Sequence, residues 1–443
     1  MVKKDWLSFV LVGVLVLIIG VGLVAKAVIG AQIKGEVSAK FPDNGAPRIN
    51  ITLNGVTLEE INSGSKEIKY EGNKVKLYEG ENVLGFDNVR VKGRGNGTWV
   101  QKKKPYQIRF SEKIDLFGLG KARKWVLLAN AMDATNLRTK TAFYLEDLLG
   151  MKYKFEGRFV ELYIDEEYEG LYYLTHAVEI GKSVVDLRDP MGVLVELDNL
   201  YYWEEDYRES RNGDYLVLKD AVDEGNGEVA MREFVSKYDE FERAVAERNY
   251  ERVGELVDVE SFAQYYLLSE FSVNPDAYWT SFYMYKDGVE DKIHAGPGWD
   301  FDLAFANGWW GNWMGEEFYS PEQTMIRRGE LLAQKEYEEM NMGGEIDWYT
   351  WSQKLSRIMF DMMEMPEFRE EVVRQYREKM QGRVEELVVM IPEWASGIEV
   401  PMREDYQKWD KGDYRKEIDD MVEWIKRRAE FFEKEYGVYK ADI

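Results

Sequence analysis

The sequence contains no cysteine and only two histidines, His176 and His294, in 443 residues. A chain without thiols forms no disulfide framework, no cysteine-bound zinc site and no thiol nucleophile. Two histidines also cannot supply a three-histidine zinc site. We therefore expect any metal site to be built from oxygen ligands, which favours magnesium, calcium or manganese.

The sequence has few basic residues for its acidic content: it contains 58 Lys and Arg and 82 Asp and Glu, which give a net charge of −24. Proteins that bind nucleic acid derive much of their affinity from Lys and Arg that neutralise phosphates, so we predict no nucleic-acid partner. Most of the acidic excess is expected to form a solvated surface. The aromatic content of 14% argues against disorder, since these side chains require burial.

An apolar segment without a charged residue extends over residues 6–25 and follows Lys3 and Lys4. A helix of this length spans a typical bilayer, and the two lysines predict a cytoplasmic N-terminus. We expect a single-pass membrane anchor at residues 1–29 with an extracytoplasmic catalytic body. The small residues on either side of Lys26 keep a cleaved signal peptide as the alternative.

The remainder divides into a β-rich part at residues 30–185 and a mainly helical part at residues 186–443. Alternating apolar and polar residues between turn residues predict strands at 48–53, 74–79, 88–93, 106–110, 159–165 and 170–175. Apolar spacing predicts helices at 135–149, 229–247, 257–268 and 413–437, with a strand pair within 281–302. We predict an α+β protein of two lobes with a ligand site in the cleft between them.

A glycine-rich loop follows the third predicted strand and comprises Gly93, Arg94, Gly95, Asn96 and Gly97. Glycine allows backbone amides to approach a ligand closely and to adopt positive φ, as a phosphate-binding loop requires. Lys102, Lys103, Lys104 and Arg109 come next and indicate a local anion pocket in an acidic chain. The alternative is a glycine-rich hairpin turn beside a solvated edge strand.

Three aspartates form a second candidate site. Asp276 follows a predicted helix, and Asp300 and Asp302 lie at the far end of the predicted strand pair. Alternate residues of an extended segment point the same way, so Asp300 and Asp302 could both reach one cation. Carboxylates suit a hard divalent ion that carries phosphate oxygens. The alternative is that these are turn and capping aspartates.

Several segments together resemble the spore-coat CotH family of atypical protein kinases, which have a two-lobed kinase-like fold. The resemblance covers roughly residues 45–310 and rests on RGNGTW, KKPYQIRF, RKWVLLANAMDATNLRTKTAFYL, VELYIDEEYEGLYYLTHAVEIG and GWDFDLAFAN in consistent order. It implies ATP and Mg²⁺ as cofactors.

The resemblance assigns roles to the aspartates. Asp276 matches the catalytic-loop aspartate, which orients the acceptor hydroxyl or takes its proton. Asp300 matches the metal-binding aspartate, and Asp302 matches the second acid of the same pattern. Ser281 falls where many kinases use Asn to hold a second metal, and it is included as a weaker metal ligand.

The resemblance also assigns nucleotide binding to the loop from Gly93 to Gly97, to Lys104 and Arg109, and to Arg138 as a phosphate or ion-pair partner. One departure is His176, which falls where many relatives have Glu, although Glu179 lies close by.

These features predict a Mg²⁺-dependent kinase that transfers the γ-phosphoryl group of ATP to a hydroxyl of a protein or cell-surface acceptor. Two alternatives stay open. One is a catalytically silent scaffold that binds a partner through the Trp-rich cluster at residues 307–319. The other is a polysaccharide-acting enzyme that uses Asp300, Asp302, Glu316 and Glu317.

Overall fold

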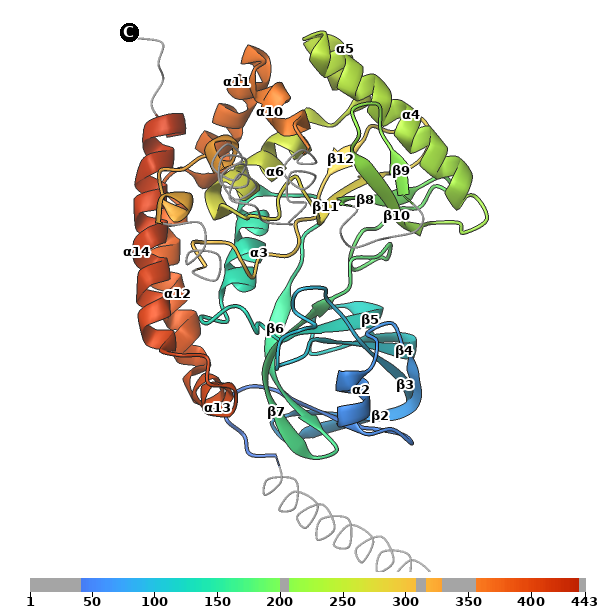
Figure 1. The fold of residues 1–443 in the computed structure, drawn as a ribbon, viewed down its shortest axis with the longest axis vertical. Coiled ribbons are helices and arrows are strands. Elements are labelled where there is room, and N and C mark those ends of the chain that lie inside the picture. The colour runs from blue at the N-terminus through green and yellow to red at the C-terminus, as the bar shows by residue number, and fades with distance from the viewer. Residues whose placement is uncertain (1–40, 200–206, 308–315, 329–355, 438–443) are drawn as a thin grey trace, which may run out of the picture.

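The computed structural model describes residues 41–199, 207–307, 316–328 and 356–437. A closed β-barrel forms one lobe, and helices with a five-stranded sheet form the other (Figure 1). The predicted α+β organisation, β-rich first and helical later, is confirmed. The predicted anchor at residues 1–29 lies outside the described residues. Within the described ranges, no helix is long and apolar enough to cross a membrane.

The barrel follows the order β1-β2-β3-β4-β5-β7-β6 and is closed by the parallel pair of β1 and β6. Its strands are β1 (Arg48–Thr52), β2 (Tyr70–Glu79), β3 (Asn82–Gly93), β4 (Tyr106–Asp115), β5 (Lys121–Leu128), β6 (Gly157–Ile164) and β7 (Glu167–His176). Side chains alternate across each strand, as β4 shows: Tyr106, Ile108 and Phe110 are buried in the barrel core. Gln107 and Arg109 therefore lie on its outer face. A short helix, α2 (Leu58–Ser63), begins with a capping box of Thr57 and Glu60.

The helix α3 (Arg138–Leu149) lies between two barrel strands in the sequence but packs in the core of the other lobe. Leu145 and Leu149 belong to the same buried cluster as Phe262 and Leu268 of α6 (Val259–Ser272). Figure 1 shows α3 beside α6, above the barrel. The chain after β5 therefore crosses to the helical lobe and then returns to form β6.

The second sheet has the order β12-β11-β8-β10-β9. Its strands are β8 (Val193–Asp198), β9 (Tyr207–Glu209), β10 (Tyr215–Ala221), β11 (Phe282–Lys286) and β12 (His294–Ala295). The strand pair predicted within 281–302 corresponds to β11 and β12, which are antiparallel. Since β8 lies between β10 and β11, both of its long edges are paired.

The remaining helical segments complete this lobe. They are α4 (Gly227–Ala246), α5 (Tyr250–Leu256), η2 (Glu316–Tyr319), α10 (Ile358–Met363), α11 (Pro366–Gln375), η3 (Tyr376–Met380), η4 (Val384–Glu386), α12 (Leu387–Gly397), α13 (Glu399–Trp409), α14 (Tyr414–Phe432) and η5 (Glu433–Gly437). Helices α12, α13 and α14 form a column along one side of the molecule, and α13 reaches down to the barrel (Figure 1). There α13 packs on β7, and this contact links the two lobes.

Candidate functional site

Two acidic loops meet at the side chain of Asn274, directly after α6. The Nδ2 of Asn274 donates to the backbone oxygen of Asp300 at 3.0 Å. Its Oδ1 accepts from the backbone N–H of Asp276 at 3.2 Å. One amide therefore connects Asp276 with Asp300, 24 residues later in the chain. The structure thus brings together the two loops that carry the predicted acids.

Asp300 is exposed and has a left-handed backbone with φ of 65°. Ser281 is also left-handed, with φ of 54°, and its Oγ donates to Oδ2 of Asp300 at 3.4 Å. The β-branched Val273, which ends α6, has φ of 48°. Left-handed conformations are unfavourable for residues other than glycine and tend to cluster at functional sites. Their concentration around Asp276 and Asp300 is a structural reason to place a site here.

The three aspartates influence one another electrostatically. Burial and the charges of Asp300 and Asp302 raise the pKa of Asp276 well above its usual value. Burial and the charge of Asp300 raise the pKa of Asp302 in the same way. Although the residue remains exposed, desolvation of the carboxyl group also raises the pKa of Asp300, against the opposing effect of Arg94. Nearby positive charge would favour the ionised forms of all three groups.

The chemistry of these donors fits magnesium. All three are carboxylates, and Mg²⁺ is usually held by one or two carboxylates together with water and substrate phosphates. In the ranges that the structure describes, no group of three or more His, Cys, Asp or Glu side chains is placed to hold one ion. Asp300 and Asp302 are the carboxylates that would hold such an ion.

Arg94 connects the glycine-rich loop to this acidic region. Its guanidinium lies 5.1 Å from the ring centroid of Trp299, the residue before Asp300. Burial lowers the pKa of Arg94, and the charges of Tyr283, Asp300 and Glu196 oppose this effect. The loop from the barrel lobe therefore faces Asp300 of the helical lobe.

The glycines of the loop have different surroundings. A Cβ atom on Gly93 would lie 2.4 Å from the Trp99 ring. Gly95 has φ of +80°, and a Cβ there would lie 2.0 Å from Oγ1 of Thr98. No heavy atom lies within 4 Å of the corresponding position on Gly97. Two glycines thus allow the loop to pack on itself, and Gly97 leaves open space where a ligand could approach.

The predicted cations occupy different surroundings. The Nζ of Lys104 donates to the Trp99 backbone oxygen and lies 5.1 Å from the centre of its ring, so Lys104 stays beside the loop. Arg109 lies on the outer face of the barrel, opposite Arg90 of β3 and Lys124 of β5. No hydrogen bond, ion pair or ring contact in the described part of the chain joins Arg109 to the aspartates.

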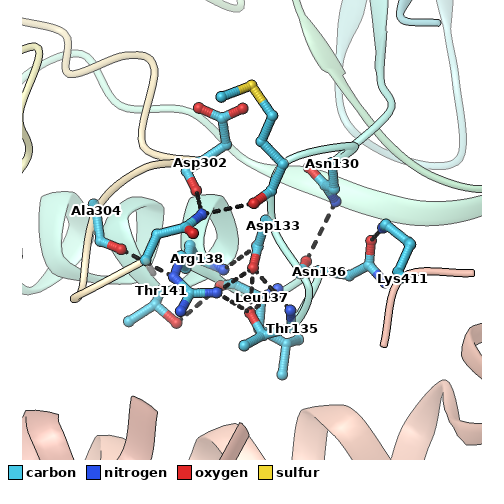
Figure 2. Close-up of polar contacts among 12 residues, drawn as sticks. Asn130, Asp133, Thr135, Asn136, Leu137, Arg138, Thr141, Asp302, Ala304 and Lys411 are labelled. Carbon is cyan, nitrogen blue, oxygen red and sulfur yellow. Dashed lines mark hydrogen bonds and ion pairs between the residues drawn. The ribbon is translucent and has the colours of Figure 1, made fainter. Parts of the chain in front are cut away.

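The structure places Arg138 in an internal ion pair rather than facing a ligand. Its side chain is 2% exposed and donates to Asp133, and its Nε donates to the backbone oxygen of Ala304 at 2.9 Å. Figure 2 shows these contacts between the start of α3 and the loop that follows Asp302. Of the two roles predicted from the sequence, the ion pair is the one observed, so we leave Arg138 out of the nucleotide site.

A family described as "CotH kinase protein" matches residues 89–432. The chain belongs to this family. The match includes the glycine-rich loop and all three aspartates, and it confirms the resemblance predicted from the sequence. Among curated proteins, no sequence matches the chain.

Sequence reasoning missed two acids of this CotH-family site, Glu196 and Asp198 of β8. Asp198 accepts from Oγ1 of Thr280 at 2.6 Å, and its charge acts on Asp300. Glu196 forms an ion pair of 2.7 Å with Lys219. The available signal was two acids spaced two residues apart in an otherwise apolar strand, VLVELD.

His176, which the resemblance marked as a departure, is a buried residue of the barrel lobe. Its ring lies 4.3 Å from the Trp125 ring, centroid to centroid, and burial lowers its pKa. Glu179 instead forms an ion pair of 2.9 Å with Lys124. A carboxylate close to this position therefore does pair with a lysine of β5.

The residues behind the alternative functions are only partly described. Most of the Trp-rich cluster, including Trp309, Trp310 and Trp313, lies outside the described residues, as does the side chain of Glu316. Glu317 is exposed and lies 3.8 Å from Arg327.

Proposed function

We propose that this CotH-family protein is a Mg²⁺-dependent kinase that transfers the γ-phosphoryl group of ATP to a hydroxyl of a protein or cell-surface acceptor. The observation that carries the proposal is the arrangement around Asn274. This residue connects the Asp276 loop to the Asp300 loop, and Arg94 approaches Asp300 from the opposite lobe. A cation held by acids and faced by a basic glycine-rich loop is the environment that a nucleotide triphosphate requires.

Each group has a separate task in this proposal. Arg94 and the amides near Gly97 bind phosphate oxygens, and Lys104 keeps the loop in place through Trp99. Asp300 and Asp302 hold magnesium, which neutralises phosphate charge when it is bound. Asp276 orients the acceptor hydroxyl and takes its proton. Its raised pKa makes it a better proton acceptor than an ordinary aspartate.

The test is phosphate incorporation from γ-labelled ATP by the full chain in detergent, with and without Mg²⁺. Because the chain contains several candidate hydroxyl acceptors, a basic and a neutral Ser-containing peptide are supplied together. We expect Asp276→Asn and Asp300→Asn each to lower incorporation by about 100-fold or more. Asp87→Asn, an exposed residue of β3, is the matched control and retains activity. Incorporation equal to that of the wild type in both site variants would refute the assignment.

We also propose that residues 1–29 anchor the protein, with the catalytic body outside the cytoplasm. The support is the uncharged run at residues 6–25 after two lysines. Protease added to intact cells is expected to digest the body, and complete protection would contradict this orientation.

A further inference from the structure

A buried carboxylate on α13, Asp405, lies between the two lobes. It is 0% exposed and lies 2.6 Å from the ammonium of Lys103, which is 2% exposed. Its Oδ1 also accepts from the backbone N–H of Leu171 in β7 at 2.9 Å. A second ammonium, that of Lys411, lies 3.4 Å from its Oδ2. One acid of the helical lobe therefore binds two cations, one on each side.

The branch through Lys103 leads to the glycine-rich loop. Lys103 and the next two residues form the base of this loop, because the Pro105 backbone oxygen accepts from the N–H of Arg94 at 3.2 Å. The Lys104 backbone oxygen accepts from the Tyr172 hydroxyl at 2.9 Å. The Lys103 ammonium also donates to the Leu171 backbone oxygen. Asp405 thus fixes the base of the loop against β7.

The branch through Lys411 leads to the segment 300–307, which contains Asp300 and Asp302 and is called the metal-binding loop below. Its ammonium donates to Oδ1 of Asn136 at 3.0 Å, in the segment 130–138 (Figure 2). The same segment contains Asp133, which binds Arg138, and Arg138 in turn binds the Ala304 backbone oxygen.

A second link joins the same two segments. The Nδ2 of Asn307 donates to the backbone oxygens of Met132 at 2.8 Å and of Asp302 at 2.6 Å. In Figure 2 the carboxylate of Asp302 points away from these contacts. Asn307 therefore fixes the backbone of Asp302 without using its carboxylate, which can still bind a cation.

We propose that Asp405 is a positioning residue that couples the glycine-rich loop to the metal-binding loop. Its catalytic consequence rests on the proposed function, but the mechanical coupling does not. One series of contacts connects Asp405 through Lys103 to the glycine-rich loop, and another connects it through Lys411 to the metal-binding loop. A displacement of one loop is therefore transmitted to the other. The approach is close: a Cβ atom on Gly170 would lie 2.4 Å from Oδ1 of Asp405.

A branch-by-branch substitution series tests this coupling in the full chain. Lys103→Met interrupts the branch to the glycine-rich loop, Lys411→Met interrupts the other branch, and Asp405→Asn interrupts both while keeping the size of the side chain. Lys408→Met is the matched control, because Lys408 lies on the same helix but pairs with Glu169 at 3.1 Å.

The first readout is amide hydrogen exchange in the nucleotide-free protein. We expect exchange to accelerate by about tenfold or more at residues 94–99 in Lys103→Met and at residues 302–307 in Lys411→Met. Asp405→Asn accelerates both segments, and Lys408→Met accelerates neither. Acceleration spread evenly over the protein, or confined to α13, would overturn the coupling. Circular dichroism checks that each variant is folded. If the Met variants do not fold, the exchange rates of Asp405→Asn alone decide whether Asp405 couples the two loops.

The second readout is phosphate transfer. We expect Lys411→Met to raise the Mg²⁺ concentration needed for half-maximal activity by about tenfold, as loss of a partner behind a metal ligand typically does. Lys103→Met raises KM for ATP instead. If the wild type transfers no phosphate, the proposed function fails, while hydrogen exchange still decides whether Asp405 couples the two loops. If the wild type is active and both Met variants change the same parameter, the branch assignment is wrong.

Discussion

Arg94 and Arg138 contact the same aspartate-containing segment, at Trp299 and Ala304, and have different surroundings. Arg94 is partly buried, belongs to a loop and faces Trp299 and Asp300. Arg138 is 2% exposed and is bound by Asp133 and the Ala304 backbone oxygen. Both arginines lie in motifs that resemble the family, so both were nucleotide-binding candidates, with an ion pair as the alternative role of Arg138. Burial and the number of internal partners separate the arginine that can meet a ligand from the one that supports the fold.

The largest expected effect tests this difference directly. Arg138→Met should lower the free energy of unfolding by about 3–5 kcal/mol, because the buried Asp133 loses its ion-pair partner. Arg94→Met should change it by less than about 1 kcal/mol, because this side chain is partly solvated. Urea denaturation measures both values. Similar losses in the two variants would mean that Arg94 is also structural.

The second prediction concerns pH and the acidic side of the site. A carboxyl group with a raised pKa in the folded state contributes stability below its unfolded pKa, and this is lost as pH rises through the folded value. Asp302 is such a group, because burial and Asp300 raise its pKa. Asp302→Asn is therefore expected to stabilise the metal-free protein at pH 7. This stability difference between Asp302→Asn and the wild type should disappear near pH 4, where Asp302 is protonated in the folded protein.

Urea titrations at several pH values in the presence of a chelator provide the measurement, with Asp87→Asn as the exposed control. A pH-independent difference between Asp302→Asn and the wild type would show that this carboxylate is not destabilised by its neighbours.

The smallest expected effect contrasts two glycines of one loop. Gly95→Ala should cost about 1 kcal/mol of stability, because its positive φ and the proximity of Thr98 leave no room for a methyl group. Gly97→Ala, which has open space around it, should leave stability unchanged and weaken ATP binding instead. Thermal unfolding and nucleotide titration separate the two effects. Equal changes of Tm in Gly95→Ala and Gly97→Ala would show that the two positions tolerate a methyl group equally.

Much of the barrel could be predicted because its strands alternate between the core and the outer face. The six strands predicted before residue 185 correspond to β1, β2, β3, β4, β6 and β7. The strand β5 was not predicted, because its sequence, KARKWVLL, combines basic residues with a continuous apolar run. All six residues of β8 are buried, and the strand therefore lacks the alternation of buried and exposed positions that identifies a strand in the sequence. Two-sided burial depends on neighbours that are distant in sequence.

The aspartates of the site were found partly by spacing and partly by resemblance. Their convergence could not be predicted, because it depends on Asn274, whose amide joins two loops that are distant in sequence. Which of its two predicted roles Arg138 has could not be decided from sequence for a similar reason, since its second partner, Ala304, lies 166 positions away. Local sequence identifies residue types that suit the chemistry, whereas tertiary contacts decide which of them come together.

Closure of the barrel by β1 and β6 has a practical consequence for the boundaries of the folding unit. The family match starts at residue 89, within β3, and so omits β1, α2 and β2. A polypeptide trimmed to residues 89–432 would lose the strands that pair with β3 and β6. Two unpaired sheet edges would then be exposed, together with core residues such as Val91 and Leu162. Such edges promote self-association, so the shortest soluble version of the catalytic body must begin before Arg48.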